Sequence, residues 1–208
     1  VTPSYTNNGV SCEGLSETFT ITVNPSAQVN EILNQDLCKG QITSPINFST
    51  TNVDGNTEYS WTNDNTNIGL AESGDGNILS FTVLNNSGES EAATITVVPT
   101  YSSSGVDCVG SAYTFVLVVN PRAQVNPIEN QILCNGDLLM PIQFNTTNID
   151  GASAYTWTNS NTLIGLASTG TGDIGAFEVV NTTTSAQQAL ITVTPIYTNN
   201  SVVCSGDP

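Results

Sequence analysis

The sequence predicts an all-β protein made of two consecutive β-sandwich modules. Apolar residues alternate with threonine and other polar residues, which is the period of a strand with one buried face. The whole pattern then recurs without a gap after 96 residues: Cys12 recurs as Cys108 and Cys204, and Cys38 recurs as Cys134. A repeat of this length is a complete small domain rather than one turn of a solenoid.

The alternation predicts six or seven short strands in each module. Before the first complete module, Phe19, Ile21 and Val23 already alternate with threonines in this way. Turn signals such as Asp54-Gly55 separate the runs, and no helical periodicity of useful length is present. In the first complete module the strands are expected near residues 27–33, 46–51, 57–63, 67–71, 78–84, 92–101 and 112–119.

The third predicted strand carries an inward-facing tryptophan. Tyr59 and Trp61 alternate there with polar residues, and the run recurs with Tyr155 and Trp157. A tryptophan in an alternating strand is expected in the core rather than as a sugar-stacking platform. Short strands with such a tryptophan are typical of an immunoglobulin-like sandwich. The sequence therefore places these four aromatic residues in the cores of the two modules.

The repeat divides the chain into three segments. Residues 1–24 are expected to be the C-terminal hairpin of a preceding module, residues 25–120 a complete immunoglobulin-like module, and residues 121–208 a second module that lacks its last strand. The linkers are Asn24-Pro25 and Asn120-Pro121. Proline donates no backbone hydrogen bond, which helps to keep one sheet from running into the next. Because the linkers are short, an extended rod of end-to-end modules is expected.

The charge of the chain is strongly one-sided. Two basic residues, Lys39 and Arg122, stand against 18 acidic ones, which gives a net charge of −16. Nucleic acids require clustered cations, so they are excluded as partners. No segment reaches the apolar length of a membrane span, so membrane insertion is not expected. Most of the acids do not recur at the 96-residue offset, which favours a role in solubility over a role in a binding site.

Catalysis finds little support in the sequence. The chain has no histidine, which removes the usual serine, cysteine and zinc arrangements, and no pair of acids is marked out for glycosidase chemistry. Asp54 and Glu58 are candidate calcium ligands, because oxygen donors in a turn suit that ion. The second copy, residues 150–154, keeps only Asp150 of these acids, so a capped turn is the simpler interpretation. We therefore expect a non-enzyme without a cofactor or a required metal.

The five cysteines belong to the repeat, and each is followed two residues later by glycine. Zinc is disfavoured, because no CxxC pair and no histidine is present. Two cysteines per module indicate disulfides and hence an oxidising, extracytoplasmic compartment.

Three disulfide patterns are open. Cys38–Cys108 with Cys134–Cys204 keeps each bridge inside one module and leaves Cys12 without a partner in this chain. Cys12–Cys38 with Cys108–Cys134 would fold the rod back at the linker prolines, and Cys38–Cys204 would join one module to the next. We favour the first pattern, because a module that is duplicated should carry its own bridge. One objection is that its two cysteines belong to opposite ends of a simple immunoglobulin topology, whereas bonded cysteines require Cα atoms about 6 Å apart.

Four motifs recur at the 96-residue offset. They are Asn-Pro-x-Ala-Gln-Val-Asn at 24–30 and 120–126, Leu-Cys-x-Gly at 37–40 and 133–136, Tyr-x-Trp-Thr-Asn at 59–63 and 155–159, and Ile-Gly-Leu-Ala at 68–71 and 164–167. With these motifs the chain resembles the tandem PKD-like or immunoglobulin-like repeats of giant bacterial cell-surface adhesins, of the gliding-motility type. The resemblance covers essentially the whole chain and implies a cell-surface location, a filamentous form and attachment to surfaces; it supplies no catalytic residues.

The functional hypothesis is a structural spacer at the bacterial cell surface. Its modules would hold a binding end of a long extracellular adhesin or filament away from the cell, with neighbouring repeats as partners. The alternative is that the modules bind surface polysaccharide, another adhesin chain or another protein directly. Tyr5, Tyr101 and Tyr197, each in a Pro-x-Tyr sequence, are the candidate exposed residues for this alternative, although they could equally pack beside the last hairpin.

Overall fold

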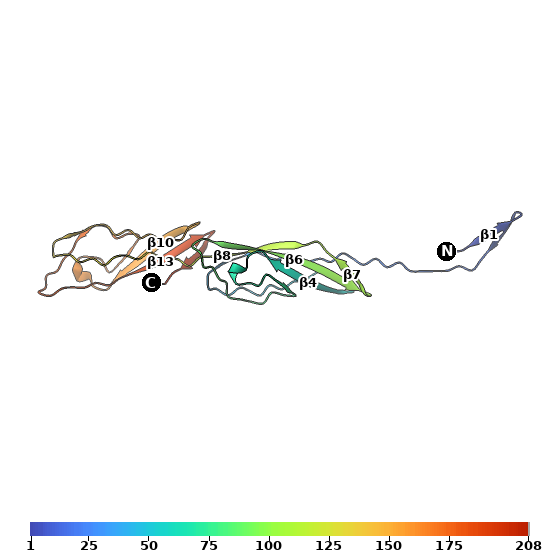
Figure 1. Ribbon diagram of the computed structural model, residues 1–208, viewed down its shortest axis with the longest axis horizontal. Coiled ribbons are helices and arrows are strands. Elements are labelled where there is room, and N and C mark those ends of the chain that lie inside the picture. Colours follow the sequence, from blue (N-terminus) through green and yellow to red (C-terminus); the bar gives the residue numbers. More distant parts are fainter. Residues whose placement is uncertain (208) are drawn as a thin grey trace.

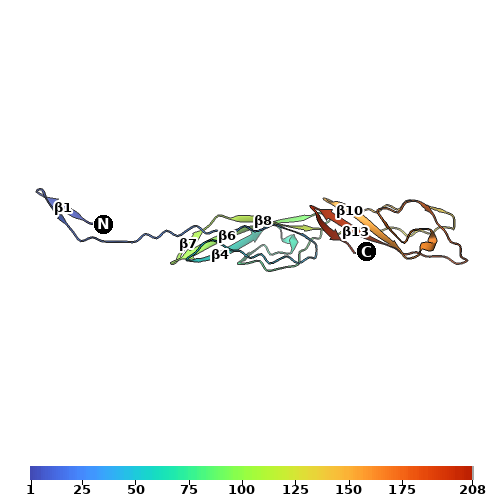
Figure 2. The ribbon, with the colours of Figure 1, turned by 180° about the vertical axis from the view of Figure 1, so that it is seen from behind.

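The computed structural model describes residues 1–207, and it is elongated. Two β-modules follow one another along the long axis, and a small N-terminal hairpin projects beyond the first module on an extended segment (Figure 1). The view from behind shows the same end-to-end order (Figure 2). No helix among the described residues is long and apolar enough to cross a membrane. The all-β sandwich fold predicted from the sequence is confirmed.

One six-stranded sheet forms the main layer of the first module. Its strand order is β3-β8-β6-β4-β5, and β7 pairs with the far end of β6. All pairs are antiparallel except β3 with β8, which run parallel. The strands are β3 (Gln35–Cys38), β4 (Asn56–Asn63), β5 (Ser73–Asp75), β6 (Glu91–Ser103), β7 (Val106–Val109) and β8 (Tyr113–Asn120).

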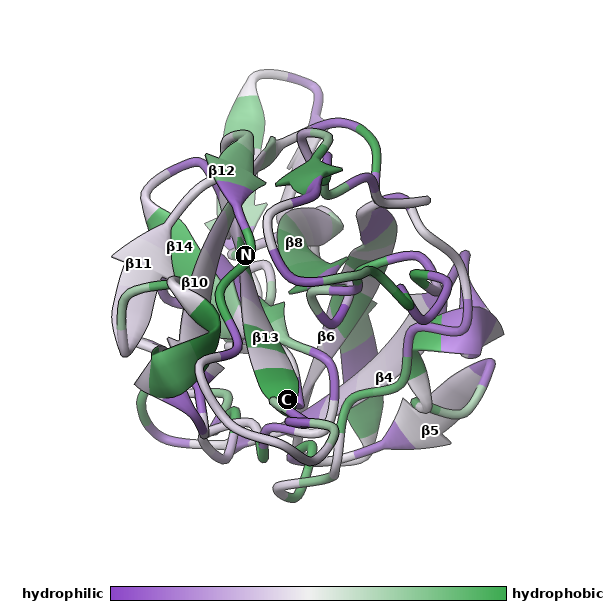
Figure 3. Cartoon of the chain, turned by 90° about the vertical axis from the view of Figure 1, so that its left-hand side faces the viewer, coloured by the Kyte–Doolittle hydropathy of each residue, from purple (hydrophilic) through white to green (hydrophobic). Residues whose placement is uncertain are grey.

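Alternation along these strands builds the core. Every second residue of β6 from Ala93 to Tyr101 is buried, and Phe115, Leu117 and Val119 of β8 are buried beside them. Figure 3 looks along the molecule from the end that carries the second module, and its strands change between hydrophobic and hydrophilic residues along their length. This is the period-2 pattern from which the sequence predicted strands.

The opposite layer is more irregular than predicted. Residues 27–33 contain neither a strand nor a bridge, and residues 46–51 and 78–84 form only isolated bridges, such as Ile46 with Ile78. Their backbone groups bond to side chains instead: the Gln28 amide donates to Asn52 Oδ1, and the Phe48 amide donates to Asn77 Oδ1. Asparagine side chains therefore take two of the backbone hydrogen bonds of this layer, and most of the others go to scattered backbone carbonyls rather than to a continuous ladder.

The strand predicted at residues 67–71 is also wrong. The chain forms a short 3₁₀ helix, η1 (Thr66–Ile68), with Asn65 as its N-cap and Gly69 after it at φ +91°. The Asn65 side chain accepts a hydrogen bond from the Asn67 amide. A capping asparagine followed by a glycine in the left-handed region stops the segment from continuing as a strand.

The second module repeats this plan with a smaller sheet. Its main sheet has the order β11-β10-β13-β14, and β12 pairs with β9 in the opposite layer. Phe144, Trp157 and Ile174 form its core. The elements are β9 (Leu138–Leu139), β10 (Ala152–Asn159), η2 (Thr162–Ile164), β11 (Thr169–Thr171), β12 (Phe177–Glu178), β13 (Ile191–Asn199) and β14 (Val202–Ser205).

The N-terminal segment stands apart from both cores. It contains the hairpin of β1 (Ser4–Asn7) and β2 (Val10–Glu13), and residues 14–34 that follow hold no strand. Phe19, Ile21 and Val23 therefore do not form the half-buried strand that their alternation predicts, and they are 75%, 76% and 86% exposed. In the described chain no strand pairs with residues 18–23, although Glu17 exchanges backbone hydrogen bonds with Val1.

Candidate functional site at the junction of the modules

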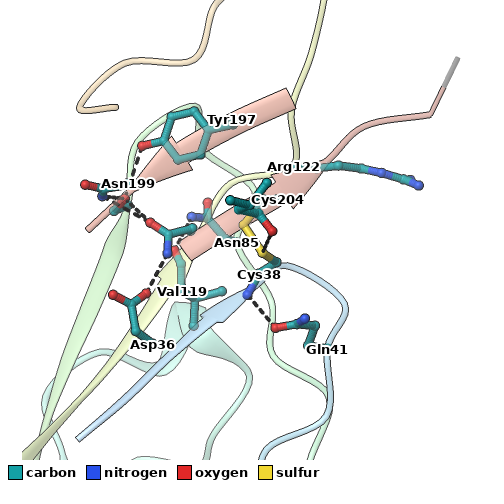
Figure 4. Close-up of a disulfide and its surroundings, with 12 residues drawn as sticks. Asp36, Cys38, Gln41, Asn85, Val119, Arg122, Tyr197, Asn199 and Cys204 are labelled. Atoms are coloured by element: carbon teal, nitrogen blue, oxygen red, sulfur yellow. Dashed lines mark hydrogen bonds between the residues drawn. A yellow bond between two sulfur atoms is a disulfide. The ribbon is translucent and has the colours of Figure 1, made fainter. Parts of the chain in front are cut away.

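The most distinctive feature outside the cores is a covalent link between the two modules. Cys38, the last residue of β3, is bonded to Cys204 in β14, at a sequence separation of 166 and with Cα atoms 5.6 Å apart (Figure 4). The turn that holds Cys38 is fixed by its own amide, which donates to Gln41 Oε1 at 2.8 Å. The bridge thus fastens the end of the first module at which β3 and β8 finish to the β13-β14 hairpin of the second module.

The favoured pairing within modules is therefore wrong. Cys38 does not bond to Cys108, and Cys134 does not bond to Cys204; Cys12, Cys108 and Cys134 have free thiols. The reason is the topology of the first module, since β3 ends level with the end of β8 and Cys108 lies at the other end of the sheet. The β6 residues opposite Val119 and Cys108 are ten positions apart, or about 33 Å along the strand.

Asn120 is the centre of a buried polar network beside the bridge. Its side chain is fully buried, and its Nδ2 donates to Asp36 Oδ1 at 2.5 Å. Its Oδ1 accepts from Ser90 Oγ at 2.8 Å and from Asn199 Nδ2 at 3.1 Å. Asn199 also donates to Ser90 Oγ at 2.8 Å, so the second module shares hydrogen bonds with the linker and with the first module. Buried polar groups satisfied in this way fix a unique geometry.

Tyr197 anchors the second module at the same place. It is fully buried, and its hydroxyl donates to the Ile149 carbonyl at 2.9 Å. The Ile149 amide in turn donates to the Gly88 carbonyl of the first module at 3.0 Å. A Cβ on Gly88 would lie 2.5 Å from the Thr147 carbonyl oxygen, so glycine permits this approach of the two backbones.

Two of the three tyrosines suggested as exposed binding residues are buried. Tyr101 and Tyr197 each donate from the hydroxyl to a backbone carbonyl and lie against Gly55 and Gly151, where a Cβ would collide with the ring. Only Tyr5, in the N-terminal hairpin, is exposed. Pro-x-Tyr is therefore a structural motif in both modules, because the ring covers the Asp-Gly turn.

An apolar cluster and one titratable group complete the junction. Cys38, Ala123, Tyr197 and Cys204 form a buried cluster with Val202 packed against it. Burial raises the pKa of the Asp36 carboxyl above its ordinary value, and the hydrogen bond from Asn120 lowers it in part. On the surface, Arg122 forms an ion pair with Asp207. The junction is held by a disulfide, hydrogen bonds and apolar packing together.

The other residues considered as sites have structural explanations. Asp54 lies in the left-handed region with φ +62°, which aspartate tolerates in turns, and Glu58 Oε1 accepts from Asn56. Within residues 1–207, no group of three or more candidate ligands could hold a metal ion.

The four aromatic residues assigned to the cores all contact core residues. Trp61 and Trp157 are each 7% exposed. Tyr59 and Tyr155 are partly buried and pack against Phe48 and Phe144, with ring centroids 5.4 and 5.5 Å apart.

Comparison with known families agrees with this architecture. Residues 35–123 match a PKD-like domain. The match begins at β3, ends just after the Asn120-Pro121 linker and so includes the whole main sheet of the first module. No protein in the comparison with curated sequences matches the chain.

Proposed function

We propose that this chain is a structural spacer in a long extracellular adhesin or surface filament. Its modules would hold a binding end away from the cell surface, as the resemblance to gliding-motility adhesins suggests. The PKD-like match indicates an extracellular, adhesion-type module. The disulfide fits a secreted protein, because such bonds persist in oxidising compartments.

The observation that carries the proposal is the Cys38–Cys204 bridge across the junction. A flexible array would need only a linker, whereas here a covalent bond and the Asn120 network fix one module on the next. Closing a loop of 166 residues contributes about 5 kcal/mol by the chain-entropy estimate. Such a junction suits a part that must keep its length and direction under load.

Direct binding of a ligand receives less support from the same residues. The aromatic side chains that would recognise a sugar, the two tryptophans and two of the three repeated tyrosines, are core residues. Phosphate and nucleic acid are poor partners, since Lys39 and Arg122 are the only cations in the sequence. We therefore keep the spacer as the single proposed function and expect no enzymatic activity.

Small-angle X-ray scattering of the oxidised chain tests the spacer. The expected profile is that of a stiff rod with two modules in line, and its maximum dimension should not change with ionic strength. The matched variant Cys38→Ser removes the bridge, and the single substitution Cys134→Ser changes a thiol outside it. A compact pair of modules, or a freely bending pair with the bridge closed, would contradict the proposal.

A further inference from the structure

Each half of the Cys38–Cys204 bridge occurs more than once in the chain. At the 96-residue offset, Cys134 is the equivalent of Cys38, and Cys12 and Cys108 are the equivalents of Cys204. Whether these three cysteines are built for the same kind of bond depends on the local geometry around each of them, which the structure describes.

Cys134 is held in the same way as Cys38. Each cysteine is followed two residues later by a glycine in the left-handed region, at φ +86° in the first module and +87° in the second. The Cys38 amide donates to Gln41 Oε1 at 2.8 Å, and the Cys134 amide donates to Asp137 Oδ2 at 2.7 Å. The glycine amide donates to a valine carbonyl of the opposite layer at 2.9 Å in both modules. The turn therefore presents Cys134 on the second module as it presents Cys38 on the first.

The hairpin cysteines also share one setting. Each lies opposite a tyrosine in its hairpin, in the pairs Tyr5 with Cys12, Tyr101 with Cys108 and Tyr197 with Cys204. The glycine two residues after each cysteine donates its amide to a proline carbonyl, at 2.8, 2.9 and 3.0 Å.

The hairpins of the two modules are also seated alike on the linkers that precede them. Gly110 lies against the Ala27 carbonyl, and Gly206 lies against the Ala123 carbonyl. Each alanine follows its linker proline by two residues. Cys108 thus has the same place relative to the start of the first module as Cys204 has relative to the start of the second.

We propose that Cys38–Cys204 is one bridge of a series. Cys134 bonds to the hairpin cysteine of a module that follows the second one, and Cys108 bonds to the turn cysteine of a module that precedes the first. The partner in both cases is another PKD-like module of this repeat, docked end to end, and the sequence separation of 166 is the same for every bridge. This inference does not depend on the spacer function.

Each bridge of the series forms by oxidation of two thiols by a disulfide oxidant such as oxidised glutathione. One cysteine thiolate attacks the oxidant and releases one glutathione thiolate. The second cysteine thiolate attacks the resulting mixed disulfide and releases the other glutathione. One protein disulfide is made and one glutathione disulfide is reduced, so the two electrons of the thiols pass to the oxidant.

The non-covalent contacts of the junction are not repeated with the cysteines. Asp36 and Ser90 bond to Asn120, and Gly88 permits the approach of residues 147–149. At the 96-residue offset their positions hold Ile132, Ala186 and Thr184. Cys134 and its turn are kept where these contacts are lost, so the covalent bond is the constant part of the junction.

Consecutive bridges of the series overlap. Cys134 lies between Cys38 and Cys204, so the bridge that begins at Cys134 starts before the preceding bridge ends. Every module with a neighbour on each side is then spanned by two bridges. Reduction of one bridge would leave the module spanned by the other.

The full chain lengthened by one repeat tests the series. A copy of residues 113–208 placed after Pro208 keeps the 96-residue offset, and serine replaces Cys134 in the copy, so that the chain has only one Cys134. After oxidation, a chymotryptic digest should contain Cys38 joined to Cys204 and Cys134 joined to the copied Cys204. The two forms of Cys204 are distinguishable, because the original peptide ends at the first residue of the copy, Tyr113, and the copied one ends at Pro208.

Alkylation with iodoacetamide gives a second measurement. The oxidised original chain should be modified at three cysteines, Cys12, Cys108 and Cys134. The lengthened chain should lose the modification at Cys134 and keep the other two. Cys134→Ser in the lengthened chain is the matched control, and in this variant the copied Cys204 should remain unbonded and be alkylated.

Three results would overturn the proposal. The first is alkylation of Cys134 in lengthened chains in which Cys38–Cys204 has formed, because that bond shows that the first two modules have folded. The second is a bond from the copied Cys204 to Cys12 or Cys108. The third is an oxidised chain without Cys38–Cys204, since the series is inferred from that bridge.

Discussion

Force applied to the two ends of the oxidised chain should not unfold either module. The bridge connects Cys38 to Cys204, so the shortest covalent path between the ends bypasses residues 39–203. Fully extended, 166 positions would span about 600 Å at about 3.6 Å per residue, whereas the bridged Cα atoms are 5.6 Å apart. Opening the bridge should therefore release about 590 Å of additional chain length.

Single-molecule force spectroscopy with attachment at both ends measures this length. The oxidised wild type should show no unfolding step of module size, and Cys38→Ser should show steps that add up to the released length. Cys134→Ser is the control, because it removes a thiol that takes no part in the bridge. Module-sized steps of about 350 Å in the oxidised wild type would refute the reasoning, because 96 residues of a bridged module could not extend.

Four further outcomes concern the cores, the junction and metals. Trp61→Ala should destabilise the first module by about 3–5 kcal/mol in denaturant unfolding followed by far-UV circular dichroism, whereas the transition of the second module, followed by the fluorescence of Trp157, should not move; equal loss in both modules would contradict separate cores. Gly74→Ala should cost about 1–3 kcal/mol, because its Cβ would collide with the Trp61 ring, whereas Gly175→Ala has open space and should be neutral. The raised pKa of Asp36 means that the folded state binds the proton more tightly, so its contribution to stability falls as pH rises from the ordinary pKa through the raised one. Asp36→Asn should then melt higher than the wild type above that interval and equally below it. EDTA should leave the melting temperature unchanged, and a fall of several degrees would reveal a required metal.

Period-2 alternation was enough to predict the fold class, but not every strand. It worked for β4, β6 and β8, where each strand has sheet neighbours and a core beneath it. It failed at residues 46–51, where the Phe48 amide donates to the Asn77 side chain, and at residues 78–84, where the Phe81 amide donates to Thr43 Oγ1. It failed also at Phe19, where the pattern is intact but the described chain provides no partner strand. Alternation thus indicates that a segment is able to form a strand, but it does not indicate whether a neighbouring strand is present to pair with it.

The junction was the least predictable part. The distance between Cys38 and Cys108 depends on the parallel pairing of β3 with β8, which local patterns do not specify. The geometric objection to a Cys38–Cys108 disulfide was correct. The argument from duplication was wrong, because a cysteine of one module can bond to a cysteine of the neighbouring module instead of to one of its own. Asn120 was visible as a repeated residue before proline, but its network joins residues as far apart as Asp36 and Asn199.

The bridge between Cys38 and Cys204 also changes the consequence of a cut in the backbone. A protease that reaches an exposed loop such as residues 182–186 would cleave a peptide bond inside the bridged segment. The two fragments would stay covalently joined, because Cys38 and Cys204 lie on opposite sides of every cut between them. A single cut in either module would thus leave residues 1–38 and 204–207 covalently connected.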